Sequence, residues 1–221
     1  MTHTLSSAVV EGKPTLGGPG RPRSTSAREL ELIALRRFSD HGFGATTVED
    51  IAREAGVSRR TFFRYFESKS GVLWSTFDHE VAAIREALED LPTDVPVMEA
   101  VRRAVIEANH YGADDVPELL ARMSLIGSEP ELIASAAVHY DAWERTISDF
   151  VAHRIGQPPN ALYPLAVGRA TLAACRAAYD CWVERADTDL TDYLDAALRA
   201  LTAGFSDAVL RDAAIDADRR A

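Results

Sequence analysis

Residues 46–66 read TTVEDIAREAGVSRRTFFRYF, a pattern typical of a helix-turn-helix. Thr46 and Glu49 have the spacing of a capping box, in which two side chains satisfy free backbone amides at the start of a helix. Gly56 stands where that helix must end, because glycine tolerates the left-handed backbone of a tight turn. Ser58 is a favourable N-cap for a second, short helix. We therefore predict two helices joined by a tight turn.

The second helix of this pair has one apolar face and one exposed face. Phe62 and Phe66 recur at helical spacing and are predicted to face the core. The outward side chains combine arginines, a hydroxyl and aromatic rings, namely Arg59, Arg60, Thr61, Phe63, Arg64 and Tyr65. A short helix with these groups suits the major groove of DNA and the flanking phosphates. The alternative is a helical hairpin whose basic face is only solvated.

Motifs on both sides of the turn resemble the DNA-binding domain of the TetR family of bacterial repressors. The matching elements lie within about residues 27 to 75 and comprise Phe38-x-x-x-Gly42-Phe43, Thr46-Thr47-Val48, Ile51-Ala52, Ala55-Gly56-Val57-Ser58, Thr61-Phe62-Phe63-x-Tyr65-Phe66 and Ser68-Lys69. The segment 57–66 is also similar to the mycofactocin-system branch of that family. The resemblance implies an all-α protein, with an N-terminal three-helix DNA-binding domain and a larger helical domain for ligand binding and dimerisation. We place these domains, called the head and the body, at residues 25–70 and 71–221.

The predicted contacts with base edges lie at the start of the second helix. Arg59, Arg60 and Thr61 are the exposed residues there, so they are the candidates for base contact. Ser58, which caps the helix, is grouped with them as a DNA-binding residue. Arg64 can reach either a base or a phosphate.

The predicted phosphate contacts come from the resemblance. Thr47, Tyr65 and Lys69 occupy the positions of the family motif that imply this role. Phe63 stands where the family usually has tyrosine, so it lacks a hydroxyl that contacts phosphate in relatives. An apolar contact of Phe63 with a thymine methyl or a sugar is the role that remains.

The first 24 residues form a separate segment rich in Gly, Pro, Ser and Thr, which we predict to be a flexible basic arm. Arg21 and Arg23 flank Pro22 immediately before the first helix. An extended arm of this kind can lie in a narrow minor groove, where the negative potential is concentrated. The alternative is a solvated tail.

Apolar stripes separated by proline and glycine predict the remaining helices. The first begins with a capping box at Ser26 and Glu29 and ends at Gly42. The others are expected at about residues 68–91, 96–112, 116–127, 130–155, 161–186 and 190–212. The long helix after the head begins in the DNA-binding domain and ends in the body, so it can carry motion between them.

The last two predicted helices have the composition of an association surface. Small side chains that permit close helix approach gather on the first, namely Ala166, Gly168, Ala170, Ala173, Ala174, Ala177 and Ala178. The second carries Leu194, Leu198, Leu201, Phe205 and Val209 at near-helical spacing. The resemblance implies that both helices pair with their symmetry mates in a four-helix bundle, and a two-fold dimer suits a pseudo-palindromic operator. The alternative is burial of both helices inside one subunit.

The middle of the body is the expected effector site. Aromatic and methionine side chains can line an apolar cavity there, namely Trp74, Phe77, Met98, Met123, Tyr140, Trp143, Phe150, Tyr179 and Trp182. The alternative for each of them is ordinary core packing. Arg102, Arg103 and Arg176 can meet an anionic ligand group. Because relatives often respond to hydrophobic drugs or acyl-CoA thioesters, we predict a small hydrophobic effector and rank acyl-CoA first.

Charge and composition narrow the function further. Residues 1–70, the arm and the head, carry 11 Lys and Arg against 8 Asp and Glu, whereas the rest carry 13 against 26, so only this N-terminal part attracts DNA. The six histidines lack metal-ligand spacing and no motif supports catalysis, so we expect no metal, no cofactor and no enzyme activity. No apolar run is long enough for a membrane span. Cys175 and Cys181 are interpreted as buried, unpaired thiols of a cytoplasmic protein.

Overall fold

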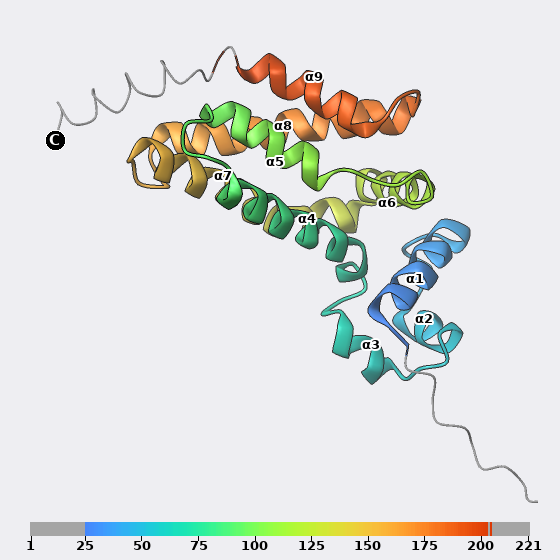
Figure 1. Ribbon diagram of the computed structural model, residues 1–221. Helices are drawn as coiled ribbons and strands as arrows, with labels where there is room; N and C mark the ends of the chain where they lie inside the picture. Colours follow the sequence, from blue (N-terminus) through green and yellow to red (C-terminus); the bar gives the residue numbers. More distant parts are fainter. Residues whose placement is uncertain (1–24, 203, 205–221) are drawn as a thin grey trace, which may run out of the picture.

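The computed structural model describes residues 25–202 and residue 204. The predicted arm with Arg21 and Arg23 lies outside the described residues, as do Phe205 and Val209. Within the described part the chain forms nine α-helices and no strand, so the all-α prediction is confirmed (Figure 1). No helix in that part has the length and hydropathy needed to cross a membrane.

Three short helices form the head. They are α1 (Ala27–His41), α2 (Val48–Glu54) and α3 (Arg59–Tyr65). Phe38, Ile51 and Phe62 are almost completely buried and fill the space between them. Gly42 and Gly56 end the first two helices at φ values of +86° and +67°, a region that residues with a Cβ rarely adopt. The predicted helix-turn-helix is therefore confirmed.

The capping of α2 differs from the prediction. Thr47 and Asp50 form the box instead of Thr46 and Glu49. The Asp50 amide donates to Thr47 Oγ1 at 3.2 Å, and the Thr47 amide donates to Asp50 Oδ2 at 3.1 Å. Thr46 is buried, and its hydroxyl donates to the Gly42 carbonyl at 3.0 Å. The helix begins one residue later because the Thr46 side chain already satisfies the turn after α1.

Six helices form the body. They are α4 (Gly71–Asp90), α5 (Val97–Ala108), α6 (Val116–Ser128), α7 (Pro130–Ile155), α8 (Leu162–Arg185) and α9 (Leu190–Thr202). α4 begins later than predicted, because Ser68 stays outside the helix and its hydroxyl accepts the Gly71 amide at 2.9 Å. α5 ends earlier than predicted, where the Asn109 side chain donates to the Val105 carbonyl at 2.8 Å. α6 packs against α1 and so joins the body to the head (Figure 1).

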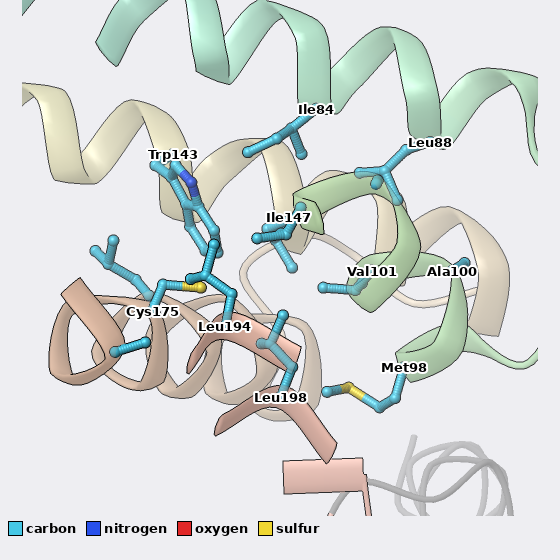
Figure 2. Close-up of a cluster of buried hydrophobic side chains, with 14 of the residues drawn as sticks. Ile84, Leu88, Met98, Ala100, Val101, Trp143, Ile147, Cys175, Leu194 and Leu198 are labelled. Atoms are coloured by element: carbon cyan, nitrogen blue, oxygen red, sulfur yellow. The ribbon is translucent and has the colours of Figure 1, made fainter. Parts of the chain in front are cut away.

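The core of the body is apolar and draws on several helices. Figure 2 shows Ile84, Trp143, Ile147 and Leu194 converging from α4, α7 and α9. Each of these side chains is almost completely buried. Because their burial removes apolar surface from water, this cluster stabilises the arrangement of helices that surrounds the cavity described below.

Part of the predicted association surface is used inside the subunit. Leu194 and Leu198 are fully buried in the core of the body. A Cβ at position 168 would lie 2.7 Å from a backbone oxygen of α7, so Gly168 lets α8 approach α7 within one chain. Ala173 and Ala177 on α8 remain exposed. The inward members of the predicted set therefore hold the body together, and the outward members remain available for a partner.

Candidate DNA-binding surface and ligand cavity

The exposed face of α3 carries the side chains predicted to read bases. Ser58 caps the helix, because its hydroxyl oxygen accepts a hydrogen bond from the Thr61 amide at 3.1 Å. The hydroxyl oxygens of Ser58 and Thr61 lie 3.0 Å apart. Arg59, Arg60 and Arg64 are exposed. Arg60 forms no ion pair with any residue that the structure describes, so its guanidinium can accept a new partner without breaking an existing one.

Arg59 is held between two helices of the head. Its Nη1 lies 3.0 Å from Glu49 Oε1 on α2, and its guanidinium carbon lies 5.3 Å from the centre of the Phe63 ring. Phe63 is 41% exposed, which leaves its ring able to make an apolar contact. The α3 surface therefore combines oriented positive charge with an exposed aromatic ring.

The three side chains assigned to phosphate contact each have a partner inside the head. The Thr47 hydroxyl donates a hydrogen bond at 2.6 Å to Asp50 Oδ2, its partner in the capping box. Tyr65 donates to the Thr25 carbonyl at 2.7 Å. Lys69 Nζ donates to the Phe43 carbonyl at 2.8 Å and lies 4.0 Å from the centre of that ring. These bonds hold turns and helix ends together, and phosphate contact remains a prediction for all three residues.

A cluster of buried charges joins the head to the body. Arg122 on α6 is 4% exposed at its side chain, and its Nη2 lies 2.6 Å from Glu31 on α1 and 2.9 Å from Glu118. Its Nη1 donates to the Leu73 carbonyl on α4 at 2.9 Å. Arg28 on α1 contacts the same Glu118 at 2.5 and 2.6 Å. We call Arg28, Glu31, Glu118 and Arg122 the joint cluster.

The joint cluster was not predicted from the sequence. Glu31 and Arg122 are 91 residues apart, and each is an ordinary charged residue within its own helix. The two helices that carry these residues, α1 and α6, must pack together before the charges meet, so no local pattern marks them.

A cavity of about 460 Å³ lies in the body and is lined by side chains of all six of its helices. Its wall contains six of the nine residues predicted for the effector site, namely Trp74, Phe77, Met123, Tyr140, Trp143 and Tyr179. Its mouth is marked by the exposed lining residues, namely Gly127, Ile133, Ala137, Arg176 and Asp180. A volume of this size is ordinary for a small-molecule site.

The remaining three predicted residues lie outside this wall, so the structure does not bring them together with the other six. Met98 is buried in the core of the body (Figure 2). Phe150 packs against the guanidinium of Arg154, 5.1 Å from the centre of the ring. Trp182 is buried and donates its indole N–H to the Thr188 carbonyl at 3.1 Å. The type of a side chain does not reveal which face of its helix meets a void.

Two smaller expectations about the body are also corrected. Only Arg176 of the three arginines considered for an anionic ligand lines the cavity, because Arg102 and Arg103 pair with Glu99 elsewhere. Cys181 is exposed rather than buried, because it lies on the outward side of α8.

Polar groups interrupt the apolar wall of the cavity at Glu80, Asn109 and Tyr179. The Tyr111 hydroxyl donates a hydrogen bond to Glu80, and the Tyr179 hydroxyl donates one to the side-chain oxygen of Asn109. Burial raises the pKa of Glu80 to about 8, and the positive charge of Arg122 only partly opposes this shift. The Glu80 carboxyl group is therefore mostly protonated at neutral pH.

Two family models match this chain. The model described as bacterial regulatory proteins of the tetR family matches residues 33–74, and the MftR C-terminal domain matches residues 95–206. The Mycobacterium tuberculosis protein named as the mycofactocin biosynthesis transcriptional regulator MftR is 33% identical over 186 residues, which are 84% of this chain and 94% of that protein. The HTH-type transcriptional regulator TcmR of Streptomyces glaucescens is 31% identical over 189 residues, covering 80% and 83%.

Solved structures share the fold at lower identity. Thermus thermophilus FadR, a TetR-family repressor in complex with lauroyl-CoA, has a TM-score of 0.54 and 23% identity, covering 80% of this chain and 93% of that chain. The complex of Stenotrophomonas maltophilia SmeT with triclosan has a TM-score of 0.58 and 20% identity, covering 83% and 93%. On the strength of the matched domains and the curated relatives, the chain belongs to the TetR family of transcriptional regulators and is not an enzyme.

Proposed function

We propose that this protein is a repressor that binds a pseudo-palindromic operator as a homodimer and is released when a small hydrophobic effector fills the cavity. The observation that carries the proposal is the position of Arg122, which lines the cavity and also pairs with Glu31 of the head. A change inside the cavity can therefore reach the DNA-binding head through one side chain. The repressor acts in the cytoplasm, where DNA and small metabolites are both present.

The head provides the DNA-binding half of this proposal. α3 enters the major groove with Arg59, Arg60 and Thr61 toward the base edges. Contact of Arg21 and Arg23 with the adjoining minor groove stays a prediction from the sequence. The positive charge of residues 1–70 and the negative charge of the rest orient the protein with its head toward the duplex.

The homodimer forms through the exposed faces of α8 and α9. Ala173 and Ala177 on α8 and Ala196 and Ala200 on α9 are exposed, and such small side chains let helices approach closely. α8 and α9 lie on the side of the body away from α3 (Figure 1). A two-fold axis through these helices therefore leaves both α3 surfaces free to face one duplex.

An acyl-CoA thioester is the effector class that we place first. The aromatic wall formed by Trp74, Phe77 and Tyr140 suits an acyl chain, and Arg176 at the mouth suits an anionic head group. The fold neighbour FadR was solved with lauroyl-CoA, and SmeT was solved with triclosan. A drug-like hydrophobic molecule is accordingly the second candidate.

Release follows from linkage between the cavity and the head. A ligand that prefers an arrangement in which the two heads no longer match the operator shifts the dimer away from DNA. The cavity wall includes Leu73 and Thr76 near the start of α4, and the Thr76 hydroxyl donates to Glu31 at 2.8 Å. Because α4 begins immediately after the head, a small displacement of these residues moves α3.

Selection of duplexes from a random pool tests the DNA-binding half. Enrichment of an inverted repeat is expected, whereas recovery of none at moderate salt would favour the alternative of a helical adaptor for acidic protein or RNA. In vitro transcription from the selected operator should fall when the protein binds, and a rise in transcript yield would contradict repression.

Titration of lauroyl-CoA into the operator complex tests the effector half. Fluorescence anisotropy of the labelled duplex should fall as the ligand releases the protein. If the anisotropy stays constant while the operator binds normally, the acyl-CoA class is rejected and DNA-binding repression is retained.

A further inference from the structure

Glu80 has a hydrogen-bonding oxygen that the described residues leave unused. Tyr111 donates to Oε1, whereas Oε2 forms no hydrogen bond or ion pair with any residue in the described part of the chain. The side chain is partly buried, and it lines the cavity. A ligand that fills the cavity removes water from this oxygen, so a ligand that supplies a new hydrogen-bond partner binds more tightly than one that does not.

Three other polar groups of the wall are already paired, namely those of Tyr179, Asn109 and Arg122. Tyr179 donates to Asn109, and Asn109 donates in turn to the Val105 carbonyl at 2.8 Å. The guanidinium of Arg122 is occupied by the carboxylates of the joint cluster. Among these four groups, only Glu80 has an oxygen that forms no hydrogen bond with the described residues, so Oε2 can meet a polar atom of a ligand.

We propose that the interior of the cavity recognises a hydroxyl group on an otherwise apolar effector, and that Glu80 is the residue that binds it. This inference deepens the proposed effector role and depends on it only in taking the cavity as the ligand site. A hydroxyl can donate or accept a hydrogen bond, so it supplies a partner for Oε2 whether the carboxyl group is protonated or ionised. An acyl chain that carries a hydroxyl satisfies this requirement and the proposed acyl-CoA class together.

Two other ligand chemistries fit this position less well. A plain alkyl chain would cover Oε2 and leave it without a partner. An ammonium group would have to lose its water, and a buried ion pair recovers that cost only when further hydrogen bonds satisfy both ions. The neighbouring polar groups Asn109 and Tyr179 are committed to each other and do not supply those bonds.

Binding of three short probes to the full chain tests the inference. We would measure the affinities of 1-octanol, 1-fluorooctane and octylamine by calorimetry, with the thermal shift of the protein as a second readout. The wild-type protein should bind 1-octanol about tenfold more tightly than 1-fluorooctane, which cannot donate a hydrogen bond. Glu80→Leu should remove this preference, and Glu80→Gln should keep most of it because the amide donates and accepts.

Asp180→Leu is the matched control, because Asp180 is an exposed carboxylate at the mouth of the same cavity. This variant should retain the preference for 1-octanol. Circular dichroism and operator binding establish that each variant is folded, and the isosteric Glu80→Gln carries the test if Glu80→Leu fails to fold.

Several results would overturn the inference. They are equal affinity for 1-octanol and 1-fluorooctane, a preference that survives Glu80→Leu, tighter binding of octylamine than of 1-octanol, and no binding of any probe. None of these measurements uses lauroyl-CoA or release from DNA. Any of these results would refute the role of Glu80. If lauroyl-CoA still releases the operator, the proposed function is retained.

Discussion

Glu80 lies in the wall of the body cavity, where burial raises its pKa from an ordinary value of 4.5 to about 8. At a pH between 4.5 and about 8, Glu80 has released its proton in the unfolded chain but keeps it in the folded chain. The contribution of Glu80 to stability is therefore complete below about pH 4.5 and is lost as the pH rises through about 8. In urea unfolding experiments, the free energy of unfolding should fall over this range more in the wild-type protein than in Glu80→Gln. A difference between the two proteins that stays constant with pH would contradict the assignment.

Arg60 and Lys69 differ in what surrounds them, and we expect different losses when each is replaced. Arg60 is exposed without an ion pair in the described residues, whereas Lys69 donates to the Phe43 carbonyl. Arg60→Ala should weaken operator binding by about 5- to 150-fold, with a smaller effect on random duplex, because it removes the proposed base contact. Lys69→Ala should weaken both duplexes alike. Anisotropy titrations measure all four affinities.

The control for this comparison is Arg103→Ala on α5, which removes an exposed arginine far from α3. It should leave both duplex affinities unchanged. If Arg60→Ala weakens operator and random duplex equally, the base-reading role of Arg60 is wrong.

At the scale of helices, the joint cluster holds α1 of the head against α4 and α6 of the body. Arg122 is buried there, so removing the negative charge of Glu31 weakens the hydrogen bond between Arg122 Nη2 and residue 31. Glu31→Gln should lower the free energy of unfolding by about 1–3 kcal/mol. It should also reduce the factor by which effector weakens operator binding, because head and body then respond less to one another. Effector titrations with and without operator measure that factor.

The exposed pair between Arg36 and Glu54 provides a matched comparison within the head. Arg36→Ala should cost about 0–1 kcal/mol, since exposed ion pairs contribute little, and it should not change the effector response. An unchanged effector response in Glu31→Gln, at equal effector occupancy, would show that coupling runs through other contacts.

At the scale of the whole molecule, the proposed homodimer holds its two heads at the distance that the operator requires, and the exposed faces of α8 and α9 form its proposed interface. Ala177→Arg places a long charged side chain on the exposed face of α8 and should convert the dimer to a monomer. Because two half-sites are then no longer held together, operator affinity should fall steeply. Sedimentation velocity and anisotropy measure the two effects. Ala83→Arg on the exposed side of α4 is the control, and dimerisation unaffected by Ala177→Arg would reject this interface.

Much of the head could be predicted from the sequence because its signals act between near neighbours. Gly42 and Gly56 end helices through their own backbone freedom, and Ser58 caps α3 through an amide three residues away. The same local logic misplaced the cap of α2 by one residue. There the buried Thr46 hydroxyl bonds to the turn that follows α1, a contact outside the helix that it was expected to cap.

The cavity and the joint cluster depend on contacts between distant segments. Tyr140 and Phe150 lie on the same helix and are both aromatic, yet only Tyr140 lines the cavity, because the packing of α7 turns its two faces toward different neighbours. Glu80 and Arg122 look in sequence like ordinary charged residues on amphipathic helices. Their burial, and with it the raised pKa of Glu80 and the pairing of Arg122 with Glu31, exists only after the helices have packed.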